Sequence, residues 1–292
     1  MPVVHLPDRA IVSVAGPDAE HLLQNVITTD LDKLLDGDAQ PGALLTPQGK
    51  ILFDFLVSRD GQGGFRLDVR RDVADDLLKR LTLYRLRAKA ELSKQDQLFI
   101  AASWGDESTA SDADSTGSET DSSIVADKRF KDVAVKRCYG WPETSSDAIA
   151  DWTALRISQG IAESGSDYAL GDAFPHDVLL DQLNGVGFRK GCYVGQEVVS
   201  RMQHRGTPRR RVLIAESDVD LPPGAELRSS EKPVGVIGST VGGAGLAIAR
   251  IDKIKQAMDA GAPILADGRE VRLRIPAWAT FTFPADAAPE EA

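Results

Sequence analysis

Apolar and polar positions change their period along the chain, and the period indicates which element forms. Short runs rich in β-branched and aromatic residues are typical of strands. Such runs predict strands over 11–14, 51–58 and 65–69. The first third of the chain is therefore predicted to contain several strands, with other elements between them.

Apolar residues spaced three or four positions apart predict helices around these strands. We expect one helix over 17–26, with Pro17 in its first turn, and another over 147–159, with Gly160 as its stop. A third amphipathic segment lies between them. The inward-facing residues are Ala19, Leu22, Leu23 and Val26 in the first, Val73, Leu77, Leu78 and Leu81 in the middle segment, and Trp152 and Leu155 in the last. Strands and helices together indicate an α+β fold.

The pattern changes again after about Arg211. Short apolar runs separated by glycine and proline follow, at 212–214, 234–237, 246–251 and 271–275. One helical segment is expected near 252–260. This pattern predicts a small β-rich domain closed by one helix, with its boundary between Gln203 and Arg211.

Charge is distributed unevenly along the chain. The net charge is −10, but 105–127 alone holds seven acids and no base, so the remainder carries about −3. This Ser-, Asp- and Thr-rich stretch cannot bury enough apolar surface to order itself, and we expect a surface loop insertion. The overall balance does not indicate a nucleic-acid partner.

Cysteine use and hydropathy limit the class of protein. The N-terminal residues have neither a basic nor an apolar signal region, and no segment has the roughly 20 apolar residues of a membrane span. The chain has two cysteines, Cys138 and Cys192, and four histidines without ligand spacing, so we expect no metal site within one chain. One disulfide between the two cysteines stays open. A cytoplasmic protein without membrane contact fits this composition.

The stretch from Lys190 to Glu197 contains the most informative chemistry. Gly191 and Gly195 flank Cys192 and permit a tight turn, and a short helix is expected over 194–201. A thiol before a helix, with Arg189 and Lys190 close in sequence, has surroundings that favour the thiolate form. The alternative for a lone cysteine is a small buried residue that fills a turn. The density of the motif favours the reactive thiol.

Two acids have two interpretations each. Asp54 interrupts an apolar strand, so it either holds a ligand or bonds neighbouring backbone amides. Asp177 can accept two hydrogen bonds from the amino-pyrimidinone edge of a pterin, or it can be a helix-start residue. His176 before it is expected to be a surface or capping residue.

The stretch from Lys190 to Glu197 resembles the KGCYxGQE signature of the folate-binding YgfZ family. Other blocks are similar to the fold that this family shares with the glycine cleavage T-protein, an aminomethyltransferase. They are 14–19, 27–30, 45–51, 155–157 with Gly160, and 243–247. The resemblance implies a multi-lobed α+β fold around a central folate cavity. It divides the chain into a folate-binding module of two interwoven lobes (1–205, with the acidic insertion at 105–127), a C-terminal β-barrel domain (206–284) and a tail (285–292).

The same resemblance implies a function. We expect a protein that binds tetrahydrofolate or a one-carbon-substituted folate and supports assembly or repair of iron-sulfur enzymes, through transient contacts with client or assembly proteins. Cys192 is the expected reactive residue, and Asp54 falls near the T-protein's catalytic acid pair, one member of which is replaced by Phe53. The expected folate-binding residues are Asp177, Lys190, Tyr193, Gln196, Glu197 and Arg201.

Two other functions stay open. The first is a folate-dependent aminomethyltransferase or other one-carbon transferase, in which Asp54 orients the folate nitrogen. The second is a non-catalytic scaffold that docks partners through the acidic insertion or the basic run 204–211. The motif cysteine and Phe53 favour the iron-sulfur hypothesis over the transferase.

Overall fold

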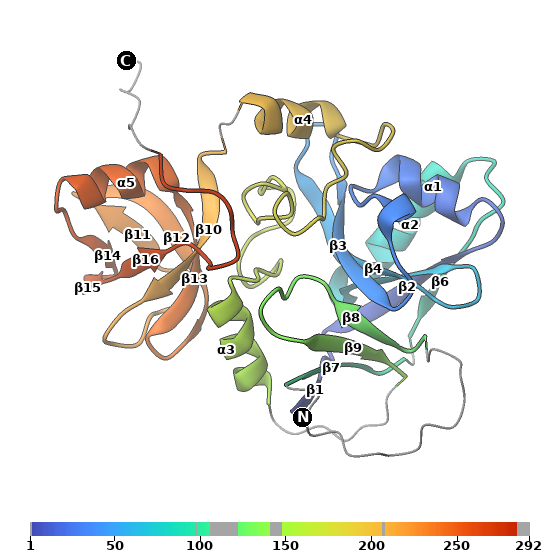
Figure 1. Ribbon diagram of the computed structural model, residues 1–292, viewed down its shortest axis with the longest axis horizontal. Helices are drawn as coiled ribbons and strands as arrows, with labels where there is room; N and C mark the ends of the chain where they lie inside the picture. Colours follow the sequence, from blue (N-terminus) through green and yellow to red (C-terminus); the bar gives the residue numbers. More distant parts are fainter. Residues whose placement is uncertain (1, 97, 106–121, 141–147, 206–207, 285–292) are drawn as a thin grey trace. The chain divides into compact units, whose positions relative to one another are not determined.

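The computed structural model describes residues 2–96, 98–105, 122–140, 148–205 and 208–284 (Figure 1). By compactness the chain forms two units. The first comprises Met1–Pro47, Leu52–Ile149 and Leu183–Gln196, and the second comprises Gln48–Ile51, Ala150–Gln182 and Glu197–Ala292. The second unit contains the expected C-terminal domain; the limits at 205, 206 and 284 stay a prediction, and the tail lies outside the described residues.

A nine-stranded sheet forms the first unit, in the order β1-β7-β9-β8-β3-β4-β5-β2-β6. Most neighbours are antiparallel, whereas β3 and β8 are parallel. The strands are β1 (Val3–His5), β2 (Arg9–Ala15), β3 (Asp38–Leu45), β4 (Ile51–Arg59), β5 (Phe65–Arg70), β6 (Glu91–Gln95), β7 (Ile100–Trp104), β8 (Ile124–Asp127) and β9 (Val135–Tyr139). The strands predicted at 11–14, 51–58 and 65–69 are confirmed and lie within β2, β4 and β5.

Two helices pack on this sheet, α1 (Ala19–Val26) and α2 (Ala74–Arg85), with α2 beside β2 and β6 (Figure 1). Their apolar stripes and the strands share one buried cluster, because the three- and four-residue spacing places these side chains on one face. α1 begins two residues later than Pro17. The carboxylate of Asp18 accepts the Lys89 amide at 2.7 Å instead of capping the helix.

The prediction of a surface loop over 105–127 is wrong at its C-terminal end. Residues 124–127 form β8, and Asp127 is buried. Its carboxylate accepts Arg129 Nη2 at 2.7 Å and Arg137 Nε at 3.2 Å. Burial opposes ionisation, but the two guanidinium groups hold the pKa of Asp127 below its usual value. Composition could not show this pairing, because both arginines follow the acidic stretch; residues 106–121 lie outside the described part.

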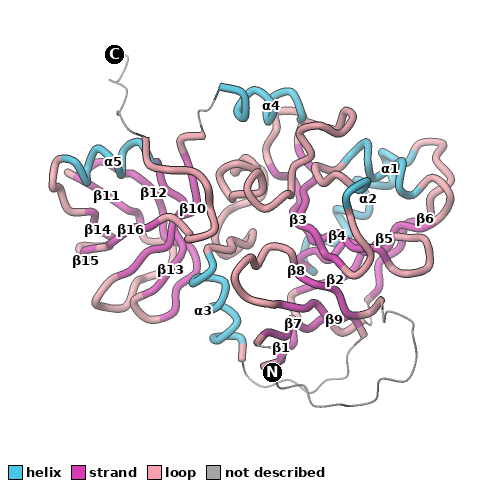
Figure 2. The backbone as a smooth tube through the Cα atoms, in the orientation of Figure 1, coloured by secondary structure: helices cyan, strands magenta, loops and turns pink. Residues whose placement is uncertain are grey.

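The second unit contains a nearly closed β-barrel sheet of seven strands, in the order β15-β14-β11-β12-β13-β10-β16 (Figure 2). They are β10 (Arg210–Glu216), β11 (Glu226–Ser229), β12 (Lys232–Val241), β13 (Ala244–Arg250), β14 (Ile264–Ala266), β15 (Arg269–Glu270) and β16 (Arg272–Arg274). The helix α5 (Ile251–Asp259) packs Ile251, Ile254 and Ala257 into the core of this sheet. The prediction of a β-rich C-terminal region with one helix is confirmed.

Two further helices differ from their predicted limits. α3 (Ile149–Gln159) ends before Gly160, as predicted, but Arg156 is buried on it while Leu155 is only half-buried. Arg156 donates to Asp167 at 3.1 Å and to Ser239 at 3.2 Å, and this pairing permits burial of its charge. α4 (Gln196–Arg205) begins two residues later than predicted, because Gly195 has a φ of 79°, outside the helical region.

Candidate functional site

The two cysteines lie in different surroundings. Cys192 is exposed in the loop before α4, whereas Cys138 is buried in β9. No disulfide joins them. Cys192 is therefore not the small buried residue of the alternative interpretation, and its sulfur can be reached from solvent.

Lys190 anchors this loop to the first unit. Its Nζ donates to the carbonyl oxygens of Ile27 at 2.9 Å and Thr29 at 2.6 Å, and it lies 5.5 Å from the centre of the Tyr193 ring. Burial lowers the pKa of Lys190 to about 8, although the charge of Asp30 opposes this shift. The ammonium group is thus directed at backbone carbonyls and an aromatic face.

The backbone before Lys190 is held against the same segment. Thr28 Oγ1 donates to the Gly185 carbonyl at 2.6 Å and accepts the Ala43 amide at 2.9 Å, while the Gly187 amide donates to the Thr28 carbonyl at 2.7 Å. A Cβ at Gly187 would lie 2.6 Å from Lys190 Cδ, so a side chain here would displace the lysine. The sequence identified 27–30 only as a block of family resemblance and did not predict this clamp.

Tyr193 is the buried member of the motif. It is 7% exposed, and within the described part of the chain its buried hydroxyl oxygen has no hydrogen-bond partner. Burial raises the pKa of Tyr193 to about 12, so the phenol is protonated at neutral pH. A buried polar group without a partner is rare and costs stability. Its Oη can donate a hydrogen bond to a ligand and accept one from it.

The end of the motif is displayed to solvent. Glu197 and Arg201 form an exposed pair one helical turn apart, with 2.7 Å between Glu197 Oε1 and Arg201 Nη2. Gln196 is half-buried, and its backbone N–H donates to the Tyr193 carbonyl at 3.3 Å. Gly191 is exposed with no atom within 4 Å of a Cβ built on it. Arg189 is also exposed.

Asp177 belongs to the second unit and is buried. Its Oδ2 accepts the Phe174 amide at 3.0 Å, as a turn residue does, and burial raises the pKa of this carboxyl group. Residues 175–184 form turns, so Asp177 bonds the backbone of a turn and is not the helix-start residue of the second interpretation. The carboxylate still has a second oxygen, which leaves one acceptor for a ligand.

His176 is not the surface or capping residue that the sequence predicted. It is fully buried, with Nε2 3.1 Å from Gln203 Oε1, and burial lowers its pKa. Its carbonyl accepts Arg211 Nη1 at 2.8 Å, and the same guanidinium pairs with Asp181 at 2.7 Å. His176 is buried because it contacts Gln203 and Arg211, which are distant in sequence.

Asp54 is half-buried in β4, between the buried Phe53 and Phe55. Adjacent strand residues point to opposite faces, so Asp54 occupies the face away from these two rings. Its expected part in catalysis stays a prediction.

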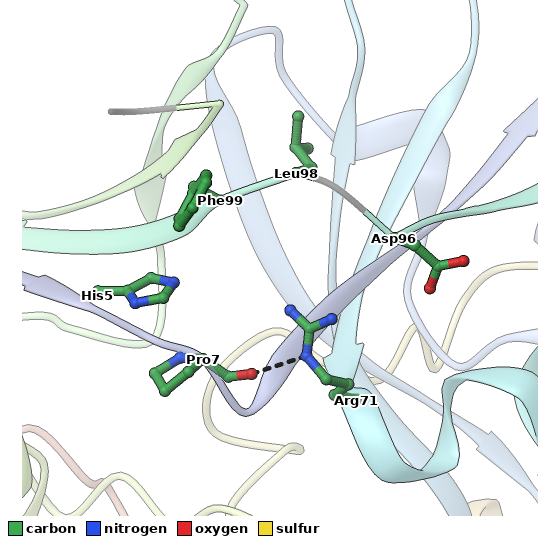
Figure 3. Close-up of a pocket in the computed structure, with 6 residues that line it drawn as sticks. All are labelled: His5, Pro7, Arg71, Asp96, Leu98 and Phe99. Carbon is green, nitrogen blue, oxygen red and sulfur yellow. Dashed lines mark hydrogen bonds between the residues drawn. The ribbon is translucent and has the colours of Figure 1, made fainter. Parts of the chain in front are cut away.

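A cavity of about 560 Å³ lies elsewhere in the first unit (Figure 3). It is lined by His5, Pro7, Arg71, Asp96, Leu98 and Phe99, and Arg71 Nε donates to the Pro7 carbonyl at 2.7 Å across it. None of the predicted site residues lines this cavity. It therefore adds nothing to the site around Cys192.

The described residues also bear on metal sites and membrane spans. They contain no group of three or more His, Cys, Asp or Glu side chains arranged to hold a metal ion. Their helices also include none with the length and apolar character of a membrane span.

Comparisons with known proteins identify proteins and a domain family to which this chain is similar. Residues 209–281 match the family described as the CAF17 C-terminal beta-barrel domain. The chain is 32% identical over 227 residues to the mitochondrial iron-sulfur cluster assembly factor IBA57 homolog of Neurospora crassa, covering 71% of this chain and 52% of that protein. It is 29% identical over 307 residues to human mitochondrial IBA57, covering 94% and 84%. The chain spans about half the length of the fungal relatives.

A solved structure shares the fold. The glycine cleavage system aminomethyltransferase T from Bartonella henselae superposes with a TM-score of 0.67 at 15% identity, over 93% of this chain and 84% of that one. The predicted T-protein-like α+β fold with a C-terminal β-barrel is confirmed. The relatives are iron-sulfur assembly factors, as the resemblance implied, whereas the signature of the YgfZ family stays a prediction.

The comparison corrects the expected location. The relatives are named as mitochondrial proteins, which points to the mitochondrion and not to the cytoplasm. The prediction of a cytoplasmic protein was wrong because it rested on composition and cysteine count, which two reducing compartments share.

Proposed function

We propose that this chain supports assembly or repair of iron-sulfur enzymes, with Cys192 as the residue that meets the cluster or its client protein. The observation that carries the proposal is an exposed thiol on a loop fixed by Lys190. Its relatives' names agree with this role. The alternatives of a transferase and a scaffold lack a comparable observation.

The number of thiols defines what Cys192 can do. An iron-sulfur cluster takes about four protein ligands, mostly cysteines. One exposed thiol supplies one ligand, and Cys138 is buried in a strand. Client or assembly proteins therefore supply the other ligands, and contact with them is transient.

We also propose that the chain binds tetrahydrofolate or a one-carbon-substituted folate. Each of two polar groups supports it by its own surroundings. Tyr193 presents a buried hydroxyl without a partner, and Asp177 retains one carboxylate oxygen beyond its bond to Phe174. Both suit the donors and acceptors of a pterin edge. Gln196, Glu197 and Arg201 are proposed as further contacts, with the exposed Arg201 suited to the folate glutamate tail.

The cysteine part is tested in cells that lack this protein. Variants Cys192→Ala and Cys138→Ala are each expressed in them, and the activity of a dependent [4Fe–4S] enzyme is measured. Cys192→Ala should lose most of the activity, and Cys138→Ala should retain it at equal protein level. Full activity with Cys192→Ala would remove the thiol from the function.

The folate part needs a separate experiment. Anaerobic calorimetric titration with tetrahydrofolate compares the wild type with Asp177→Asn and with Asp172→Asn, whose carboxylate is exposed. We expect binding at least tenfold weaker for Asp177→Asn only. No saturable binding by the wild type would reject the folate and leave the cysteine role standing. Methylene transfer from an aminomethylated carrier to tetrahydrofolate, lost in Asp54→Asn, would favour the transferase instead.

A further inference from the structure

The C-terminal end of α2 contains a leucine in a conformation that glycine normally occupies. Leu86 follows the helix with φ 48° and ψ −106°. The Ala88 amide donates to the Arg85 carbonyl at 2.8 Å, which closes a four-residue turn with Leu86 at its second position. These angles are close to the values of about +60° and −120° for that position of a type II′ turn, where glycine dominates.

Nothing in the fold explains why a leucine stands there. The side chain of Leu86 is 86% exposed, so burial does not compensate for the strained backbone. Leu83, one turn earlier, is 68% exposed, whereas Leu77 and Leu81 on the other face are fully buried. α2 therefore has a second apolar surface in addition to its core face. Strain without local compensation is typical of functional positions.

Three exposed cations lie close in sequence to the two leucines. These cations are Arg80, Arg87 and Lys89, and Arg80 and Arg87 form no ion pair with any described residue. The acids of α2 are already neutralised, Asp75 by Lys94 at 2.9 Å and Asp76 by Lys79 at 3.2 Å. This local excess of positive charge occurs on a chain whose net charge is −10.

We propose that Leu83 and Leu86, with Arg80 and Arg87, form a docking surface for an acidic protein segment that carries apolar side chains. The leucines supply the apolar centre of the contact, and the arginines pair with carboxylates around it. Three exposed cations near two leucines are fewer than the four to eight that typically hold a protein on an anionic membrane. The charge pattern therefore favours a protein partner. The proposal does not use Cys192 and does not depend on its proposed role.

The test uses the full chain with methyl-labelled leucines and a synthetic amphipathic helix that has a leucine face bordered by glutamates. Binding is followed by the NMR shifts of the Leu83 and Leu86 methyl groups. The same helix with lysines in place of glutamates controls for charge. Vesicles of phosphatidylcholine, with and without phosphatidylglycerol, test the membrane alternative.

Three variants make the result decisive. Leu86→Gly should raise the melting temperature, because glycine accepts the turn, and should weaken peptide binding at least tenfold. The double variant Arg80→Glu and Arg87→Glu should weaken binding similarly without a loss of fold. Leu35→Gly removes another exposed leucine, at a position without positive φ, and should leave binding unchanged.

Several outcomes would overturn the proposal. They are an absence of shifts with the acidic helix, equal binding of the lysine helix, and shifts caused by anionic vesicles alone. A lower melting temperature for Leu86→Gly would show that the backbone at Leu86 is not strained. A higher melting temperature with unchanged peptide binding would show that the leucine is not retained for docking.

Discussion

The two ends of the Lys190–Glu197 stretch behave differently although they are adjacent in sequence. Lys190 and Tyr193 are directed into the first unit, where the lysine holds two carbonyls and the tyrosine is buried. Glu197 is 86% exposed and pairs with Arg201 at the surface. The Lys190 end of the motif therefore anchors the loop, whereas the Glu197 end is exposed at the surface. We expect only the anchor to affect stability strongly.

Replacing Lys190 by Met should produce the largest effect. The carbonyl oxygens of Ile27 and Thr29 lose their lysine donor, and we expect unfolding free energy to fall by about 2 kcal/mol at pH 7. Denaturant unfolding measures it. Lys33→Met, which removes an exposed lysine, is the control. Equal stability of the two variants would show that the anchor contributes little.

The pH dependence of this difference sharpens the same test. The folded pKa of Lys190 is lowered to about 8, whereas the pKa of an unfolded lysine is near its ordinary value of 10.5. Between these values the unfolded chain binds more protons, so this group's contribution to stability rises with pH. The stability difference between wild type and Lys190→Met should therefore grow from pH 8 to pH 10. A difference that shrinks over this window would contradict the direction of the shift.

Gly187→Ala tests the anchor without touching the lysine. The new Cβ would lie 2.6 Å from Lys190 Cδ and 3.0 Å from Asp30 Cβ, and we expect a loss of about 1 to 2 kcal/mol. Cys192 should also react faster with a thiol reagent as the loop loosens. Gly191→Ala meets no atom within 4 Å and should change neither quantity.

Tyr193→Phe should stabilise the chain by about 1 kcal/mol, because it removes a buried hydroxyl without a partner. Tyr139→Phe is the matched contrast, since the Tyr139 hydroxyl donates to Asp68 Oδ2 at 3.5 Å and its loss should not stabilise. Thermal unfolding compares the two. If Tyr193→Phe also weakens folate binding, the hydroxyl is retained for the ligand at the expense of stability.

Glu197→Gln should have the smallest effect on stability, about 0.3 kcal/mol or less, because exposed pairs one turn apart contribute little. Urea unfolding should place this variant within error of the wild type. A loss near that of Lys190→Met would end the distinction between the two ends of the motif.

Local patterns predicted the elements well. The runs at 51–58 and 65–69 became β4 and β5, and Gly160 ended α3, because each depends on neighbours a few residues away. The buried charges could not be predicted in this way. Asp127 pairs with Arg129, two residues later, and with Arg137 in β9, whereas His176 contacts Gln203 and Arg211. Only the fold shows that these groups are buried together.

The candidate site shows the same division. The sequence identified the density of chemistry around Cys192, but it assigned Lys190 to the thiol or the ligand. The fold brings Ile27 and Thr29, about 160 residues earlier, to its ammonium group. Asp177 was left with two interpretations, and its bond to the Phe174 amide became visible only in the folded turn.

By itself, therefore, the sequence determined the α+β class, the positions of most strands and helices, and the motif that contains the thiol. These follow from periodicity and backbone preference, which act over a few residues. Only the tertiary structure decided which charges are buried, which thiol is exposed and which end of the motif is an anchor. Burial and pairing depend on segments distant in the chain, and the free energy of a charge depends on what surrounds it.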